Sequence, residues 1–87
     1  MYKLIIVDDE DLIRKYLSES FDWNSFGFEL AGVFEDGADA WDYICSHPVD
    51  IVLSDIKMTF LSGLDLAKKI YETYPHIAVI LISGHKD

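Results

Sequence analysis

The chain has 87 residues, and 51% of them are apolar, which is enough for one small domain with a packed core and excludes a disordered segment. Seven basic and 16 acidic residues give a net charge of −9, which excludes nucleic-acid binding by this segment and disfavours an anionic membrane surface as a partner. The apolar runs are too short for a membrane span or a signal peptide, and a single cysteine cannot form an internal disulfide. We therefore expect a reduced, cytoplasmic setting.

Four short apolar runs, at residues 4–7, 28–34, 51–53 and 77–82, are predicted to be β-strands. The first, third and fourth runs consist almost entirely of β-branched residues and leucine without polar alternation. This pattern is typical of strands that are buried on both faces of a parallel sheet. The second run is interrupted by Glu29, so we expect it at an edge of the sheet.

The three stretches between these runs carry apolar residues at helical spacing, so each is predicted to be an amphipathic helix. Asp36 is placed to cap the second helix, and Pro75 ends the third. The expected apolar faces are Leu12, Ile13, Tyr16 and Leu17; then Ala38, Trp41, Ile44 and Cys45, with Trp41 and Cys45 in the core; then Leu64, Ala67, Ile70, Tyr71 and Tyr74.

Strands that alternate with helices predict an open α/β parallel sheet with right-handed crossovers and helices on both faces. We expect residues 1–87 to form a single domain. Residues 83–87 would form a loop that opens another helix, but the chain stops there, so we expect residues 1–87 to be the N-terminal part of a larger domain.

Polar residues follow three of the predicted strands, at residues 8–11, 54–55 and 83–84. Because parallel strands share a direction, these residues should meet at one edge of the sheet, which is where ligands bind in such folds. Crowded carboxylates from Asp8, Asp9 and Asp55 favour a bound cation, and oxygen ligands of this kind suit Mg²⁺, which would in turn draw in a phosphate. Asp55 is the best candidate nucleophile, and Ser83 could hydrogen-bond a phosphoryl oxygen.

Four segments resemble the receiver domain of two-component response regulators: IIVDDE at residues 5–10, DIVLSDIKM at 50–58, SGLDL at 62–66 and VILISG at 79–84. The resemblance implies a flavodoxin-like sheet with strand order 2-1-3-4-(5), from which this chain would lack the fifth strand and the last helices. It also implies a domain that accepts a phosphoryl group from a histidine kinase and is not itself an enzyme.

The resemblance assigns a role to each candidate site residue. Asp55 would be the phosphoacceptor, and Ser83 would be the hydroxyl that turns inward on phosphorylation. Mg²⁺ would be bound by Asp8, Asp9, Asp55 and the backbone carbonyl of Lys57. Segment 22–28 further resembles an extension found in receivers that are joined to AraC-type DNA-binding domains, which implies a covalently linked output domain that regulates transcription.

The chain departs from the family pattern at two places. Thr59 stands where the family usually has proline, which should loosen the turn that carries the Lys57 carbonyl. The family's phosphate-contacting lysine belongs to the fifth strand, and Lys86 is not at that position. Without a fifth strand the fourth would be an uncovered apolar edge, so we expect the 87-residue chain to self-associate.

Two other functions are compatible with parts of the sequence. A haloacid-dehalogenase-type phosphatase would use Asp9, Asp11 and Ser83, but it leaves Asp55 unexplained. An interaction module on the same fold would lack the acidic pair or the acceptor, and this chain has both. Simpler roles also exist for single residues: an acid at a strand end can cap a helix, and Arg14 and Lys15 can form a solvated helix face.

Overall fold

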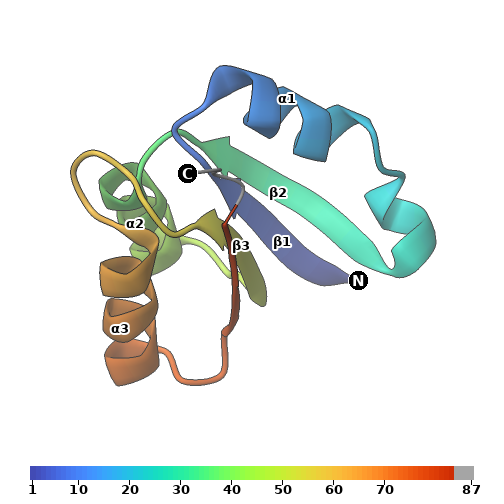
Figure 1. The fold of residues 1–87 in the computed structure, drawn as a ribbon. Helices are drawn as coiled ribbons and strands as arrows, with labels where there is room; N and C mark the ends of the chain where they lie inside the picture. Colours follow the sequence, from blue (N-terminus) through green and yellow to red (C-terminus); the bar gives the residue numbers. More distant parts are fainter. Residues whose placement is uncertain (84–87) are drawn as a thin grey trace.

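The structure is a computed structural model that describes residues 1–83, in which a four-stranded parallel sheet carries helices on both faces (Figure 1). The elements alternate along the chain as the apolar runs predict. They are β1 (Tyr2–Val7), α1 (Asp11–Glu19), the 3₁₀ helix η1 (Trp23–Phe26), β2 (Phe28–Phe34), α2 (Gly37–Ser46), β3 (Ile51–Asp55), α3 (Gly63–Thr73) and β4 (Ala78–Ile82).

The strand order is β2-β1-β3-β4 and all pairs are parallel, which confirms the predicted flavodoxin-like order. β1 lies between β2 and β3, and Val7 at its end is opposite Ser54. The β1–β2 pairing shifts by one residue after Leu4, because Leu4 is opposite Leu30 whereas Ile5 is opposite Gly32. The central position of β1 and β3 explains why their apolar runs contain no polar residue.

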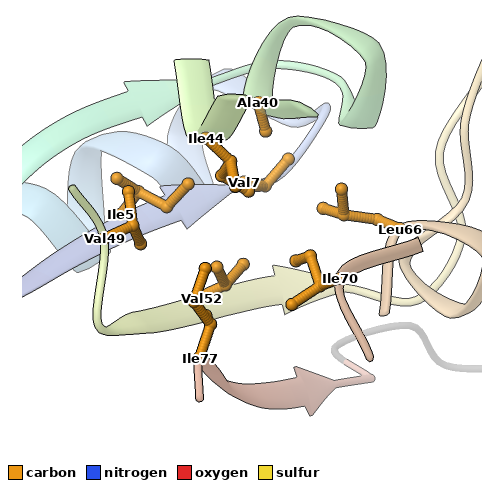
Figure 2. Close-up of a cluster of buried hydrophobic side chains, with 9 residues drawn as sticks. All are labelled: Ile5, Val7, Ala40, Ile44, Val49, Val52, Leu66, Ile70 and Ile77. Carbon is orange, nitrogen blue, oxygen red and sulfur yellow. The ribbon is translucent and has the colours of Figure 1, made fainter. Parts of the chain in front are cut away.

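The core lies between the sheet and helices α2 and α3 (Figure 2). Side chains from β1 and β3 meet those of Leu66 and Ile70 on α3, both of which are fully buried. Burial of these side chains supplies most of the free energy of folding, at roughly 25 cal/mol per Å² of apolar surface. The buried cluster consists of Ile5, Val7, Ala40, Ile44, Val49, Val52, Leu66, Ile70 and Ile77.

The opposite face of the sheet is covered less completely, by α1 and η1 (Figure 1). No residue of α1 is buried, and Leu12 is 80% exposed, so the predicted packing of Leu12 and Tyr16 is wrong. Trp23 of η1 packs on this face instead, and its indole Nε1 donates a hydrogen bond to the carbonyl oxygen of Leu17 at 2.9 Å. An apolar hollow of about 230 Å³ remains between Leu4, Trp23, Phe28, Ile51, Leu53 and Ile80.

Within residues 1–83, β4 pairs only with β3 and is an edge strand. Its side chains are therefore not buried on both faces as predicted, and Ile80 is 51% exposed. An exposed apolar edge at β4 is the feature from which we expect self-association. Self-association itself stays a prediction.

Only some residues of the apolar faces predicted for the helices are buried. Asp36 caps α2 as predicted, because its side chain accepts a hydrogen bond from the backbone N–H of Ala38 at 2.8 Å. Cys45 is exposed, however, and Trp41 is only half-buried, because α2 turns Ala40 and Ile44 towards the sheet. Likewise α3 buries Leu66 and Ile70 and leaves Leu64 and Tyr71 exposed.

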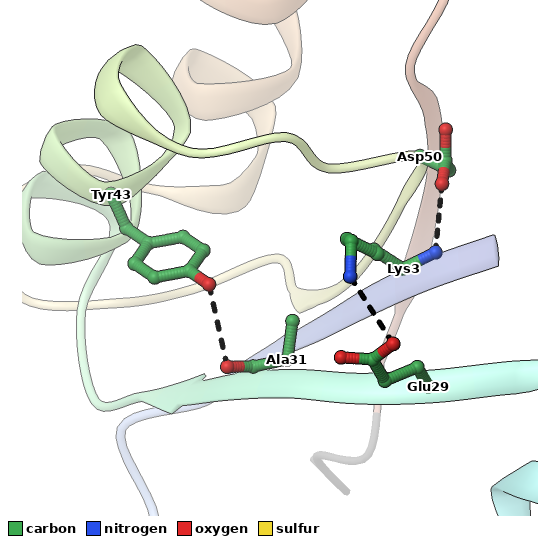
Figure 3. Close-up of polar contacts among 5 residues, drawn as sticks. All are labelled: Lys3, Glu29, Ala31, Tyr43 and Asp50. Atoms are coloured by element: carbon green, nitrogen blue, oxygen red, sulfur yellow. Dashed lines mark hydrogen bonds and ion pairs between the residues drawn. The ribbon is translucent and has the colours of Figure 1, made fainter. Parts of the chain in front are cut away.

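Polar contacts away from the acidic edge join β1 to β2 and to the residue before β3, and join α2 to β2 (Figure 3). The backbone N–H of Lys3 donates to the Asp50 carboxylate at 2.7 Å, and the Lys3 ammonium pairs with Glu29 at 3.1 Å. The Tyr43 hydroxyl donates to the carbonyl oxygen of Ala31 at 3.4 Å. The two contacts of Lys3 lie at the amino ends of the strands and agree with the register that aligns their carboxyl ends.

Candidate functional site

Asp8 and Asp55 lie side by side because of the register between the two central strands. Val7 is opposite Ser54, so the next residue of each strand, Asp8 and Asp55, reaches the carboxyl edge of the sheet at the same level. Asp8 still belongs to the sheet ladder, since its backbone N–H donates to the carbonyl oxygen of Phe34 at 3.0 Å. Both carboxylates are thus carried by rigid strand ends.

These two carboxylates are buried and hydrogen-bonded to the backbone that follows them. Asp8 is 4% exposed and Asp55 is 1% exposed. One oxygen of Asp8 accepts a hydrogen bond from the N–H of Glu10 at 2.9 Å, and one oxygen of Asp55 accepts from the N–H of Ile56 at 2.8 Å. Buried carboxylates require partners of this kind, because an unpaired charge is costly to bury.

Asp9 completes a group of three acids at this edge. One carboxylate oxygen from each of Asp8, Asp9 and Asp55 lies within 4.8 Å of the others. Asp9 is exposed, so the group opens to solvent on its side. The structure therefore brings together the three acids that the sequence predicts as metal ligands.

Burial of Asp8 raises the pKa of its carboxyl above the ordinary value of 3.8. The hydrogen bond from Glu10 acts in the opposite direction, and the negative charges of Asp55, Asp9 and Glu10 raise the pKa further. A divalent cation among these oxygens would relieve both the burial cost and the repulsion. Three carboxylates with room for water on one side match the ligand preference of Mg²⁺, so the residues fit this ion.

The loop between β3 and α3 is held tightly against the end of β3. The N–H of Gly63 donates to the carbonyl oxygen of Ile56 at 2.8 Å, and a Cβ on Gly63 would lie 2.0 Å from the carbonyl oxygen of Asp55. No other residue fits there without moving the backbone of Asp55. Lys57 and Thr59 lie in this loop and are exposed, with Lys57 two positions after Asp55.

Ser83 follows β4 at the same edge of the sheet. Ile82 is opposite Asp55, and its carbonyl oxygen accepts a hydrogen bond from the N–H of Ile56 at 3.2 Å. The next residue, Ser83, is exposed. Gly84, which closes the fourth motif, and Lys86 lie outside the described residues.

Arg14 is the residue at this edge that the sequence does not identify. The side chain is only 17% exposed, and Nη1 donates to the carbonyl oxygen of Asp8 at 2.7 Å. Arg14 is therefore not part of a solvated helix face, as its neighbour Lys15 is. The spacing could have suggested this contact, because Arg14 is one helical turn beyond the acidic residues.

Comparisons with known proteins agree with the geometry of this edge. The family model for the response regulator receiver domain matches residues 4–87. The chain is 38% identical to the REC domain of AraT, a response regulator from Geobacillus stearothermophilus, with a TM-score of 0.88 over 94% of this chain and 64% of that one. It is 32% identical to a two-component transcriptional regulator AraC from Clostridium phytofermentans, with a TM-score of 0.87 over 100% of this chain and 70% of that one.

Curated relatives are longer proteins. The transcriptional regulatory protein YesN of Bacillus subtilis is 34% identical over 97% of this chain, and the transcriptional regulatory protein HptR of Staphylococcus aureus is 32% identical over 100% of it. The chain spans 23% of the length of YesN and 34% of the length of HptR. Among residues 1–83 there is no helix with the length and apolar character needed to cross a bilayer.

Proposed function

We propose that this chain, which belongs to the family of response regulator receiver domains, accepts a phosphoryl group on Asp55 and thereby switches a linked output. The single observation that carries the proposal is the position of Asp55. Its carboxylate is buried at the end of a central strand, within 4.8 Å of the carboxylate oxygens of Asp8 and Asp9.

Asp8, Asp9 and Asp55 would hold Mg²⁺, together with the backbone carbonyl of Lys57. When bound, the ion would neutralise the acids and the oxygens of the incoming phosphoryl group. In the transfer, a carboxylate oxygen of Asp55 forms a bond to phosphorus while the bond from phosphorus to the donor atom breaks, and the product is an aspartyl phosphate. Such transfers depend mainly on positioning and on charge neutralisation, which rigid strand ends and clustered acids supply.

The Ser83 hydroxyl would turn inward and donate a hydrogen bond to a phosphoryl oxygen. Its place directly after β4, whose last residue Ile82 is opposite Asp55, supports this role. The turn of Ser83 would carry the modification of Asp55 to the surface around β4, which is the basis of the switch.

The proposed donor is the phosphohistidine of a sensor histidine kinase, and the proposed output is a covalently linked DNA-binding domain in the cytoplasm. The names of YesN and HptR as transcriptional regulatory proteins support this output. The net charge of −9 supports DNA binding by the linked domain and not by this segment.

The domain would act as a stoichiometric acceptor and not as a turnover enzyme. A phosphatase that uses Asp9, Asp11 and Ser83 would have no role for Asp55, the most buried carboxylate of the group. Slow hydrolysis of the aspartyl phosphate would reset the switch.

The test is to incubate the full-length protein with acetyl phosphate and Mg²⁺ and to follow covalent phosphate by intact mass and peptide mapping. We expect one phosphate per chain, on Asp55, and no labelling of Asp55→Asn. The matched control is Asp65→Asn, which changes an exposed acid of α3 and should label as the wild type does. Labelling of Asp55→Asn at another residue, or continuous release of phosphate without an adduct, would reject the proposal.

A further inference from the structure

Arg14 makes two contacts with the loop that carries the acidic residues. Its Nη1 donates to the carbonyl oxygen of Asp8 at 2.7 Å, and its Nη2 pairs with the carboxylate of Asp11. The side chain is 17% exposed, so the guanidinium is held close to the protein surface and not extended into water. Arginine suits this position because its planar fork can donate in two directions at once.

The same loop is fixed from its other side by Glu10. The N–H of Glu10 donates to the Asp8 side chain at 2.9 Å, and the carbonyl oxygen of Glu10 accepts from the N–H of Arg14 at 3.0 Å. The side chain of Asp8 is thus tied to Glu10, and its main chain is tied to Arg14. Together these bonds close the loop between the end of β1 and the second turn of α1.

We infer that Arg14 is a positioning residue for the carboxylates of Asp8 and Asp9, and that it sets the affinity of the acidic group for Mg²⁺. The inference rests on the proposed function, because it concerns the same site. Arg14 touches the main chain of Asp8 and not its carboxylate. Its effect on the metal therefore passes through the shape of the loop.

Charge and geometry predict opposite effects when Arg14 is replaced by a neutral residue, and this makes the inference testable. Removal of a cation near the site should by charge alone tighten Mg²⁺ binding. Loss of the bond to the Asp8 carbonyl should instead weaken it, because groups that orient metal ligands typically change metal affinity by about 10- to 100-fold. We expect geometry to dominate.

The experiment measures MgCl₂ binding to the full-length protein by isothermal titration calorimetry. Arg14→Gln should bind Mg²⁺ about tenfold more weakly than the wild type. Lys15→Gln removes the same charge from the adjacent exposed residue and should bind with the wild-type affinity or slightly tighter. Arg14→Lys keeps the charge but loses the fork, and it should fall between the wild type and Arg14→Gln.

A second measurement needs no metal. In the Mg²⁺-free protein, hydrogen exchange of the Glu10 amide, which donates to Asp8, should be about tenfold faster in Arg14→Gln than in Lys15→Gln. Far-UV circular dichroism and the thermal midpoint confirm that each variant is folded. Asp11→Asn should leave the Arg14 bond to the Asp8 carbonyl in place and keep most of the wild-type affinity. This variant is measured against the wild type if Arg14→Gln does not fold.

The outcomes separate the two proposals. If Arg14→Gln binds Mg²⁺ as tightly as Lys15→Gln and the Glu10 amide exchanges at the same rate in both, the role of Arg14 is rejected while the metal site stands. A loss of affinity in Asp11→Asn as large as the loss in Arg14→Gln rejects the inference that Arg14 acts through its bond to the Asp8 carbonyl, because the ion pair with Asp11 would then be the important contact. If the wild type does not bind Mg²⁺, the proposed site fails and this inference fails with it.

Discussion

Two loops at the carboxyl edge of the sheet carry acidic residues and use them differently. In the loop between β2 and α2, the Asp36 carboxylate caps α2, because it accepts a hydrogen bond from the N–H of Ala38 at 2.8 Å. In the loop between β1 and α1, Glu10 is at the cap position of α1 but its side chain makes no capping bond. Asp8 and Asp9, at the start of that loop, lie beside Asp55 instead.

The difference shows how a structural acid can be told from a candidate functional one. Asp36 has a local partner that accounts for it, so its charge stabilises a helix end. Asp8 and Asp9 gather with an acid more than 40 positions away in the sequence, and burial, followed by the negative charges of its neighbours, raises the pKa of Asp8. A cluster that costs free energy in the folded protein, at the edge where α/β sheets bind ligands, indicates a site.

The largest effect expected from this comparison concerns phosphorylation. Asp9→Asn should slow labelling of Asp55 by acetyl phosphate by roughly 100-fold, because it removes a ligand of the cation that neutralises the phosphoryl oxygens. Asp36→Asn, which keeps an acceptor for the helix cap, should label at the wild-type rate. The rate is measured by intact mass against time. Equal rates in the two variants would contradict the different roles assigned to Asp9 and Asp36.

The next effect concerns stabilisation by the metal. Mg²⁺ at ten times its dissociation constant should add about 1.4 kcal/mol to the free energy of unfolding of the wild type, or roughly 5–10 °C in the thermal midpoint. Asp9→Ala should lose this shift. Asp39→Ala, a change to an exposed acid in the first turn of α2, should retain it. A thermal midpoint that does not change with Mg²⁺ in any variant would contradict the assignment of the three acids as Mg²⁺ ligands.

A smaller and opposite pattern is expected at the capping loop. Asp36→Ala should lower the free energy of unfolding by about 1 kcal/mol, because the N–H of Ala38 loses its acceptor. That loss lowers the thermal midpoint by roughly 4–8 °C, and the further shift caused by Mg²⁺ should be unchanged. Denaturant melts with and without Mg²⁺ test both statements, and a reduced Mg²⁺ response would mean that the capping loop shapes the site.

The smallest effect concerns pH in the absence of metal. The pKa of Asp8 is raised in the folded protein, so the folded state binds its proton more tightly than the unfolded state does. Its contribution to stability is therefore fully present below the unfolded value of 3.8 and is lost as the pH rises through the folded pKa. Asp8→Asn should be more stable than the wild type at neutral pH, with a difference that shrinks on acidification. A constant difference across the titration would argue against a raised pKa.

The pattern of apolar runs predicts the alternation of strands and helices and the meeting of the acids, whereas the strand order follows from the resemblance to receiver domains, and the observed order β2-β1-β3-β4 agrees with it. The apolar runs of β1 and β3, at residues 4–7 and 51–53, contain no polar residue; Asp8 follows the first run directly, and Asp55 follows the second after Ser54. Parallel strands then bring the two acids together without further information. Asp36 as a cap is equally local, and it is confirmed.

The errors arise where a partner from elsewhere in the chain decides burial. Leu12 and Cys45 match a helical period but face solvent, because the surface that a helix covers depends on how it crosses the sheet. Ile80 is exposed because the described part of the sheet ends at β4. Arg14 looks like any charged helix residue until its bond to the Asp8 carbonyl is seen.

Because all four strands are parallel, the two edges of the sheet should differ in how well they tolerate substitutions and insertions. Loops at the carboxyl edge carry the acids, whereas η1 and the turns before β3 and β4 lie at the amino edge. Changes at the amino edge that leave the contacts of Lys3 with Asp50 and Glu29 in place should therefore not disturb the acids. A sensor peptide could therefore be grafted at the amino edge while the acids at the carboxyl edge keep their positions.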